Sequence, residues 1–214
     1  MPRNDERARG HERPRNDSRR RNDERARIAH LAARIMAEDG IEDHALAKKK
    51  AARQAGVADF SQLPGNDEID QALRAYREIY DAGNHRAQLT ALREIAVRVM
   101  AELDAFNPHL TGAVLSGIAG KYAGIQLQLF TDDVKAVELF LMASGAHYQS
   151  GQTSLYSGDT RITVPLFTLD DDGASIEITV LSPRDARLPL KTSLAGKTIE
   201  RAKRAAVEEL LSQA

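Results

Sequence analysis

The spacing of the apolar residues changes near Pro108, and this change sets the fold class. Before Pro108, apolar residues recur at helical spacing. After it, they form short runs that alternate with polar residues or are rich in β-branched side chains, which is the pattern of strands. The sequence therefore predicts an α+β chain. A helical N-terminal region at 28–106 precedes a small mixed β-sheet with flanking helices at 108–214.

Turn residues divide the helical region into separate helices. Four apolar stripes at helical spacing are predicted, and they begin at Ile28, Ala45, Ile69 and Leu89. Gly40 ends the first stripe and Gly56 the second, since glycine commonly follows the last residue of a helix. Pro64-Gly65-Asn66 predicts a turn before the third.

Four short apolar segments after Pro108 favour strands. They are residues 110–115, 125–130, 161–169 and 175–181. A helix that starts at Asp132 or Asp133 is expected between the second and the third, and a final helix at 197–211 is expected to pack against the sheet. Asp-Asp-Asp-Gly at 170–173 predicts a hairpin turn, because Asp and Gly tolerate the left-handed backbone of tight hairpins.

Residues 1–27 differ in composition from the rest of the chain. They hold ten arginines and six acidic residues, and they repeat Arg-Asn-Asp-Glu-Arg-Ala-Arg at 3–9 and 21–27. Because they offer almost nothing apolar to bury, they are predicted to form a disordered Arg-rich tail. Residues 28–214 hold 20 basic and 25 acidic residues, and this mildly acidic balance argues against nucleic-acid binding as the main role.

Composition also excludes several classes of site. The chain has no cysteine, which excludes disulfides and thiolate metal sites, and its six histidines show no paired spacing that indicates zinc. No apolar run reaches the roughly 18 residues of a membrane span, and residues 1–27 lack the apolar core of a signal peptide. We expect a cytoplasmic protein with no metal site and no membrane association.

A glycine-containing turn and a strand with two glutamines form the most informative motif. The turn at 115–120 reads Leu-Ser-Gly-Ile-Ala-Gly, and the strand at 125–129 reads Ile-Gln-Leu-Gln-Leu. Residues two apart on a strand point to the same face, so Gln126 and Gln128 share one face while the apolar residues pack inward. Glu177 and Thr179 share a face of a later strand for the same reason.

This order of strand, glycine turn, strand, helix and further strands resembles the core of the nucleotidyltransferase superfamily over residues 108–182. Gly117 matches the turn glycine, and Gln126 and Gln128 stand at the positions of the two paired aspartates. Glu177 matches the third carboxylate, which makes it the candidate catalytic residue. The resemblance further implies a set of ligand-binding residues, with a nucleotide as their ligand: Ser116, Gly117, Gly120, Lys121, Gln126 and Gln128.

A second resemblance covers a shorter stretch. The sequence Leu-Gln-Leu-Phe-Thr-Asp at 127–132 and the helix around Val137-Glu138 are similar to those of a family of bacterial proteins of comparable length. That resemblance implies no particular activity.

The two glutamines change what a nucleotidyltransferase-like face can do. In that family the paired aspartates hold two magnesium ions, which orient a nucleoside triphosphate and neutralise its charge. Magnesium prefers charged oxygen ligands, and a glutamine amide carries no charge. We therefore expect a module that binds a nucleotide or a protein partner, with nucleotidyl transfer lost or weakened. Magnesium would be a cofactor only if the chain is catalytic.

Other interpretations of the same residues stay open. Gln126 and Gln128 fit the solvated face of a half-buried strand, and Asp132 and Asp133 fit the N-cap of the next helix. A second functional hypothesis keeps magnesium-dependent transfer through Glu177 with Asp132 or Asp133. A third hypothesis is a regulator that binds DNA through the N-terminal helices.

Overall fold

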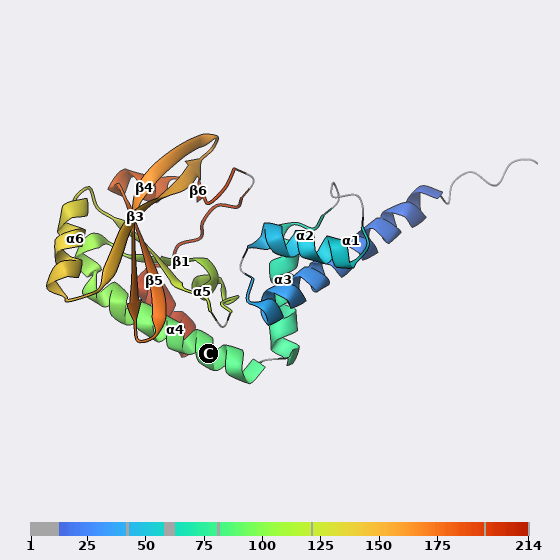
Figure 1. The fold of residues 1–214 in the computed structure, drawn as a ribbon, viewed down its shortest axis with the longest axis horizontal. Helices are drawn as coiled ribbons and strands as arrows, with labels where there is room; N and C mark the ends of the chain where they lie inside the picture. Colours follow the sequence, from blue (N-terminus) through green and yellow to red (C-terminus); the bar gives the residue numbers. More distant parts are fainter. Residues whose placement is uncertain are drawn as a thin grey trace, which may run out of the picture. The chain divides into compact units, whose positions relative to one another are not determined.

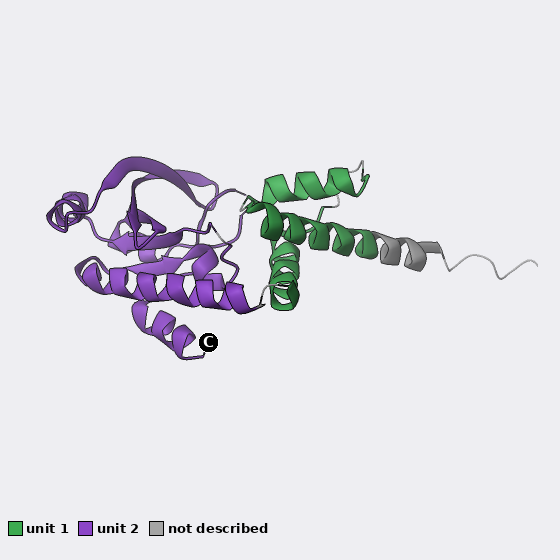
Figure 2. Ribbon diagram, turned by 60° about the horizontal axis from the view of Figure 1, so that its bottom comes forward, with its two compact units in different colours: residues 1–80 green, residues 81–214 purple. Residues whose placement is uncertain are grey.

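The computed structural model describes residues 13–41, 43–57, 63–80, 82–120, 122–194 and 196–213, with the backbone alone at 13–21 and 82. The chain divides into two compact units, residues 1–80 and residues 81–214, which are green and purple in Figure 2. Each unit is described by itself. Within the described ranges, no helix combines the length and the apolarity that crossing a membrane requires.

The first unit contains three described helices. They are α1 (Arg13–Asp39), α2 (His44–Gln54) and α3 (Asn66–Tyr80). Gly40, with φ of 66°, follows the last residue of α1, and the Asp43 side chain caps α2 by accepting from the amide of Ala45 at 2.7 Å. Helix α1 packs against both α2 and α3. Its buried face includes Ala32 and Ala33, and small side chains of this kind let helices approach closely.

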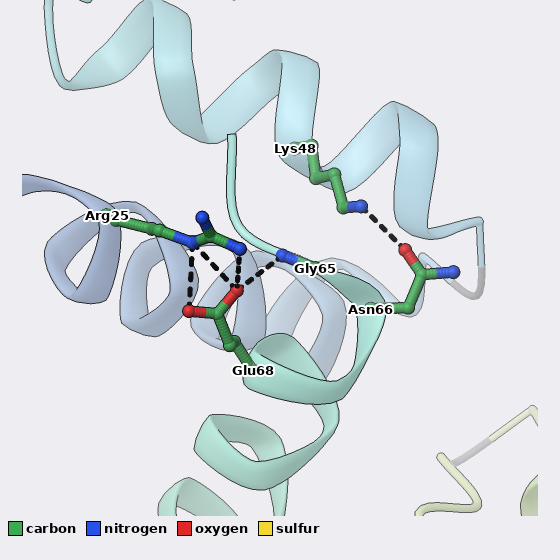
Figure 3. Close-up of polar contacts among 5 residues, drawn as sticks. All are labelled: Arg25, Lys48, Gly65, Asn66 and Glu68. Atoms are coloured by element: carbon green, nitrogen blue, oxygen red, sulfur yellow. Dashed lines mark hydrogen bonds and ion pairs between the residues drawn. The ribbon is translucent and has the colours of Figure 1, made fainter. Parts of the chain in front are cut away.

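A set of polar contacts ties the start of α3 to the other two helices (Figure 3). Nη2 of Arg25 on α1 donates to Oε2 of Glu68 at 2.7 Å, and the same oxygen accepts from the amide of Gly65 at 2.6 Å. The hydrogen bond from Arg25 lowers the pKa of the Glu68 carboxyl. Nζ of Lys48 on α2 donates to Oδ1 of Asn66 at 2.6 Å.

These contacts bear on the prediction for residues 1–27. Residues 13–27 are helical and form the first part of α1, where the composition predicted a disordered tail; residues 1–12 lie outside the described residues. Arginine, alanine and glutamate are good helix formers. Tertiary contacts also support this part of α1, because Arg25 bonds to Glu68 and Nη2 of Arg27 donates to the carbonyl of Ala55 at 3.1 Å.

The second unit is a six-stranded mixed, curled sheet with flanking helices, in the order β1-β2-β5-β4-β3-β6 (Figure 1). Strands β2 and β5 are parallel, and the other neighbouring pairs are antiparallel. The strands are β1 (His109–Thr111), β2 (Ile125–Phe130), β3 (Tyr148–Ser157), β4 (Thr160–Asp171), β5 (Ala174–Leu181) and β6 (Leu190–Lys191). The helical segments are α4 (Ala82–Glu102), η2 (Asp104–Phe106), α5 (Gly112–Ser116), α6 (Val134–Ala143), η3 (Pro183–Arg187) and α7 (Arg204–Ser212). The α+β fold class is therefore confirmed.

The main hydrophobic core covers one face of this sheet. Helices α4, α6 and α7 contribute buried side chains such as Met100, Val137 and Val207. Strand β2 contributes Ile125, Leu127 and Leu129, so the prediction that these three residues pack inward is confirmed. Helix α4, which the sequence placed in the N-terminal helical region, thus shares its core with the sheet.

The strand and helix predictions succeed unevenly. Strand β2 and the turn between β4 and β5 are confirmed, with Asp172 at φ of 48° and Gly173 at φ of 77°. The strand predicted at 110–115 is wrong after Thr111, because Gly112 turns the chain at φ of 71° into α5. Strand β3 was not predicted. The final helix begins at Arg204, whereas the sequence predicted a start at residue 197.

Candidate functional site

A row of polar side chains crosses the sheet on the face opposite the main core, here called the second face. Residues paired across neighbouring strands share a face, and the pairing aligns one polar residue from each of five strands. This polar row consists of Thr111 on β1, Gln126 on β2, Glu177 on β5, Thr168 on β4 and Gln149 on β3.

The middle of the polar row is a pair of exposed side chains that contact each other. Nε2 of Gln126 donates to Oε2 of Glu177 at 3.3 Å, so two predicted site residues do meet. Thr111 is buried beside them, and its hydroxyl donates to the backbone carbonyl of Gln126 at 3.2 Å. Gln126 and Glu177 are both exposed residues, and their side-chain oxygens can accept hydrogen bonds from a ligand.

Gly112 is the glycine that lies against Gln126. A Cβ at this position would collide with Oε1 of Gln126, and its φ of 71° disfavours any other residue. The sequence-based prediction missed Gly112, because it assigned the role to Gly117. No signal in the local sequence marked Gly112, because its place beside Gln126 follows from the pairing of Thr111 with Gln126 in the sheet.

The predicted glycine turn lies against α4. A Cβ at Gly117 would lie 3.7 Å from Nη2 of Arg93 and 3.9 Å from Cδ2 of Leu89. The carbonyl of Gly120 accepts from Nε2 of Gln88 at 3.0 Å, and the Ser116 hydroxyl donates to the carbonyl of Ala113 at 3.4 Å. These residues of the turn therefore contact α4 and α5, and none of these contacts involves Gln126 or Gln128. Lys121 lies outside the described residues.

Gln128 is buried and already has an internal partner. Its side chain is 3% exposed, and its Oε1 accepts from Nε of Arg201 at 2.7 Å. The guanidinium of Arg201 also lies 5.3 Å from the ring centroid of Phe130. Burial lowers the pKa of Arg201, and the charge of Asp185 opposes this shift. Arg201 is 73 residues from Gln128 in the sequence and was not predicted to belong to the site.

The acidic residues after β2 do not join Glu177. Asp133 caps α6 by accepting from the amide of Ala136 at 2.8 Å, which confirms the N-cap interpretation. Glu177 pairs with Gln126 near the start of β2, whereas Asp132 follows its end. At about 3.3 Å per residue, the stretch of β2 from Gln126 to Phe130 alone spans roughly 13 Å. Among the described residues, no group of three or more histidine, aspartate or glutamate side chains could hold a metal ion.

A cavity adjoins one end of the polar row. It has a volume of about 530 Å³, and Gln149 and Thr168 of the polar row line it together with His147, Asp170 and Ser175. Pockets that bind small molecules commonly have volumes of about 300–1,000 Å³. Gln126 and Glu177 do not line this cavity.

Comparisons of the chain with protein-family models, with curated proteins and with solved structures found no match. For the N-terminal unit, α2 ends at Gln54 and α3 begins at Asn66. This separation exceeds the three- or four-residue turn of a helix-turn-helix motif, so the described helices give no support to DNA binding of that kind.

His109 on the second face predicts a pH-dependent stability. Its ring packs against Phe130 with 5.0 Å between centroids, and burial, together with the charges of Lys203 and Arg201, lowers its pKa, while a hydrogen bond with the Asn107 carbonyl opposes the shift. Because its pKa is about 6.5 in the unfolded chain, the unfolded state binds more protons just below that pH. The free energy of unfolding should therefore fall as the pH drops through 6.5 toward the folded-state pKa.

Urea unfolding of the wild type and of His109→Gln at pH 7.5 and pH 5.5 measures this contribution. The other histidines contribute equally to both proteins, so the loss of stability at the lower pH should be smaller in His109→Gln. An equal loss in both would show that His109 does not titrate as described.

Proposed function

We propose that residues 81–214 form a nucleotidyltransferase-like module that binds a nucleotide on the second face and has lost metal-dependent transfer. The observation that carries this proposal is the exposed pair of Gln126 and Glu177, in contact at 3.3 Å and flanked by Gly112. The positions of this pair on parallel neighbouring strands support the resemblance to that superfamily.

The chemistry of the polar row suits the base and the sugar of a nucleotide. Glutamine amides offer a donor and an acceptor side by side, which complements the edge of a nucleobase. A carboxylate such as Glu177 accepts hydrogen bonds from ribose hydroxyls, a role that acidic residues have in dinucleotide-binding folds. Because like charges repel, the same carboxylate directs phosphates away from this part of the face.

The donor set does not fit a pair of magnesium ions. Gln126 and Gln128 are neutral, and the oxygen of Gln128 is bonded to Arg201. Of the two side chains in contact, Gln126 and Glu177, only Glu177 is a carboxylate. Asp132 and Asp133 follow the other end of β2. Magnesium-dependent transfer through Glu177 with Asp132 or Asp133 is therefore not the function that the geometry favours.

Calorimetry with ATP, CTP, GTP and UTP tests the proposal, in magnesium and in EDTA. The wild type should bind at least one nucleotide, and Gln126→Ala should weaken that binding about tenfold, since it removes hydrogen bonds to the ligand. Gln152→Ala is the matched control, because Gln152 is exposed on β3 but three residues from Gln149, and therefore on the opposite face.

No binding of any nucleotide under either condition would reject the nucleotide and leave the module as a candidate for a protein partner. Equal weakening by Gln126→Ala and Gln152→Ala would move the site away from the polar row.

A further inference from the structure

The segment that carries Arg201 joins the two edges of the curled sheet. This C-terminal strap, residues 188–203, contains β6, which pairs with β3 at one edge. It then returns to β1 at the other edge, where Leu110 and Ala202 exchange two backbone hydrogen bonds of 2.8 and 2.9 Å (Figure 1). Leu190 and Ile199 of the strap pack on the apolar part of the second face, beside Phe130. The strap thus places Arg201 on the same face as the polar row.

Arg201 is a half-buried cation whose hydrogen-bond acceptors are all neutral. They are Oε1 of Gln128 at 2.7 Å and the carbonyls of Ala186 and Leu188, both at 3.1 Å. Its Nη2 group is buried and has no hydrogen-bond partner among the described residues. A buried donor without a partner is costly, and in folded proteins it is often satisfied by a water molecule or an ion.

Arg201 belongs to a segment rich in basic residues, although the carboxylate of Asp185 also acts on its charge. The positive charges of Arg201 and Lys203 both act on His109, which places the three basic groups close together at β1. Residues 182–204 hold seven basic and two acidic residues, although residues 28–214 as a whole are net acidic. One of the two acids, Asp185, accepts a hydrogen bond from the amide of Ser182 at 3.2 Å. This concentration of positive charge favours an anion.

We propose that Arg201 binds a phosphate group of the ligand and supplies, without a divalent metal ion, the positive charge that the phosphate needs. The proposal rests on the proposed function and assigns an orientation to the nucleotide. Gln126 and Gln128 are two residues apart on one face, or roughly 7 Å. The base and sugar then lie at Gln126 and Glu177, and the phosphates lie toward Gln128 and Arg201.

The geometry also indicates how the phosphate reaches the guanidinium. The bond from Nη1 of Arg201 to the Leu188 carbonyl is exposed, whereas the bonds from Nη1 to the Ala186 carbonyl and from Nε to Gln128 are partly buried. A phosphate oxygen can replace the Leu188 carbonyl and keep the bond to Gln128. The exchange is favourable because a bond between two charged groups is stronger than one to a neutral carbonyl.

Calorimetry in EDTA with pyrophosphate, ATP and adenosine tests the proposal in the full chain. Arg201→Gln should weaken pyrophosphate and ATP binding about tenfold or more and leave adenosine binding unchanged. Arg201→Lys, which retains the charge but not the planar fork, should fall between Arg201→Gln and the wild type. Arg187→Gln, which removes an exposed arginine of η3, should behave as the wild type.

A readout in the wild type covers the case in which Arg201→Gln does not fold. Pyrophosphate bound at Arg201 adds negative charge near His109, so it should raise the pKa of His109 in a proton NMR titration. His109→Gln identifies the signal. An unchanged His109 titration at saturating pyrophosphate would overturn the proposal.

The outcomes separate this proposal from the proposed function. ATP binding that is equal in wild type and Arg201→Gln, or that requires magnesium, overturns the role of Arg201 and leaves a nucleotide site at Gln126. Pyrophosphate binding that depends on Arg201, with no added affinity for ATP and no binding of adenosine, supports the phosphate site and rejects the nucleotide. If pyrophosphate does not bind, the role of Arg201 is rejected.

Discussion

Replacing Gly112 with alanine is expected to lower the free energy of unfolding by about 1–2 kcal/mol. A left-handed backbone costs a non-glycine residue about 1–2 kcal/mol. The steric cost is small beside it, because the atom that a Cβ would meet is the end of the flexible, exposed Gln126 side chain, which can move aside. Gly112 has φ of 71°, and its Cβ would collide with the side chain of Gln126. Urea unfolding monitored by circular dichroism measures the change.

Two further variants separate these causes. Gly158 has φ of 60° in the turn between β3 and β4 and nothing within 4 Å of an added Cβ, so Gly158→Ala should cost only the backbone part, about 1–2 kcal/mol. In a Gln126→Ala background, Gly112→Ala should cost nearly the same as in the wild type, because the Gln126 side chain can move aside in the wild type. A much larger cost in the wild-type background would show that the Gln126 side chain is held rigidly against Gly112.

Replacing Arg93 with methionine should destabilise the protein by about 2–4 kcal/mol. Arg93 is 8% exposed, and its Nε and Nη2 each donate at 3.2 Å, to the carbonyls of Val114 and Leu115 at the end of α5. A hydrogen bond to a charged group contributes about 1.5–3 kcal/mol, and the relief of burying a charge offsets part of the loss. Burial desolvates the charge of Arg93 and thereby lowers its pKa.

The matched control for Arg93 is Arg98→Met on the same helix. Arg98 forms exposed ion pairs with Asp171 and Asp172 at 2.8 and 2.6 Å. Exposed pairs of this kind contribute at most about 1 kcal/mol. The free energy of unfolding, measured from urea unfolding curves, should therefore be clearly lower for Arg93→Met than for Arg98→Met. Similar stabilities would mean that Arg93 does not hold α5 in place.

Strand β2 shows what local pattern can predict in this chain. Ile125, Leu127 and Leu129 alternate with Gln126 and Gln128, and the alternation identified both the strand and the side that faces the core. The turn at Asp172 and Gly173 was equally predictable, since left-handed backbone selects these residue types.

Strand β3 and α5 show where local pattern is insufficient. Residues 149–153 of β3 are Gln, Ser, Gly, Gln and Thr, which lack apolar alternation, and the strand forms because it pairs along its whole length with β4. The apolar residues 113–115 favoured a continued strand, but the left-handed Gly112 turns the chain into α5.

Local pattern predicted some residues of the candidate site but not those that tertiary contacts bring to it. Gln126 and Glu177 follow from alternation on two strands, and the pairing of those strands brings them together. Gly112 and Arg201 depend on tertiary contacts, and nothing in their local sequence distinguishes them from other glycines and arginines. Long-range contacts therefore determine which part of the second face is polar, neutral or positively charged.

The most direct measurement of the central claim follows the side-chain amide signals of glutamine in a ¹⁵N-HSQC spectrum as ATP is added. Single Gln→Ala variants identify the signals. If the second face binds the nucleotide, the amide signals of Gln126 and Gln128 should shift in a saturable way, with and without magnesium, while that of Gln152 stays in place. Shifts confined to other parts of the chain, or the absence of any shift at millimolar ATP, would contradict the claim.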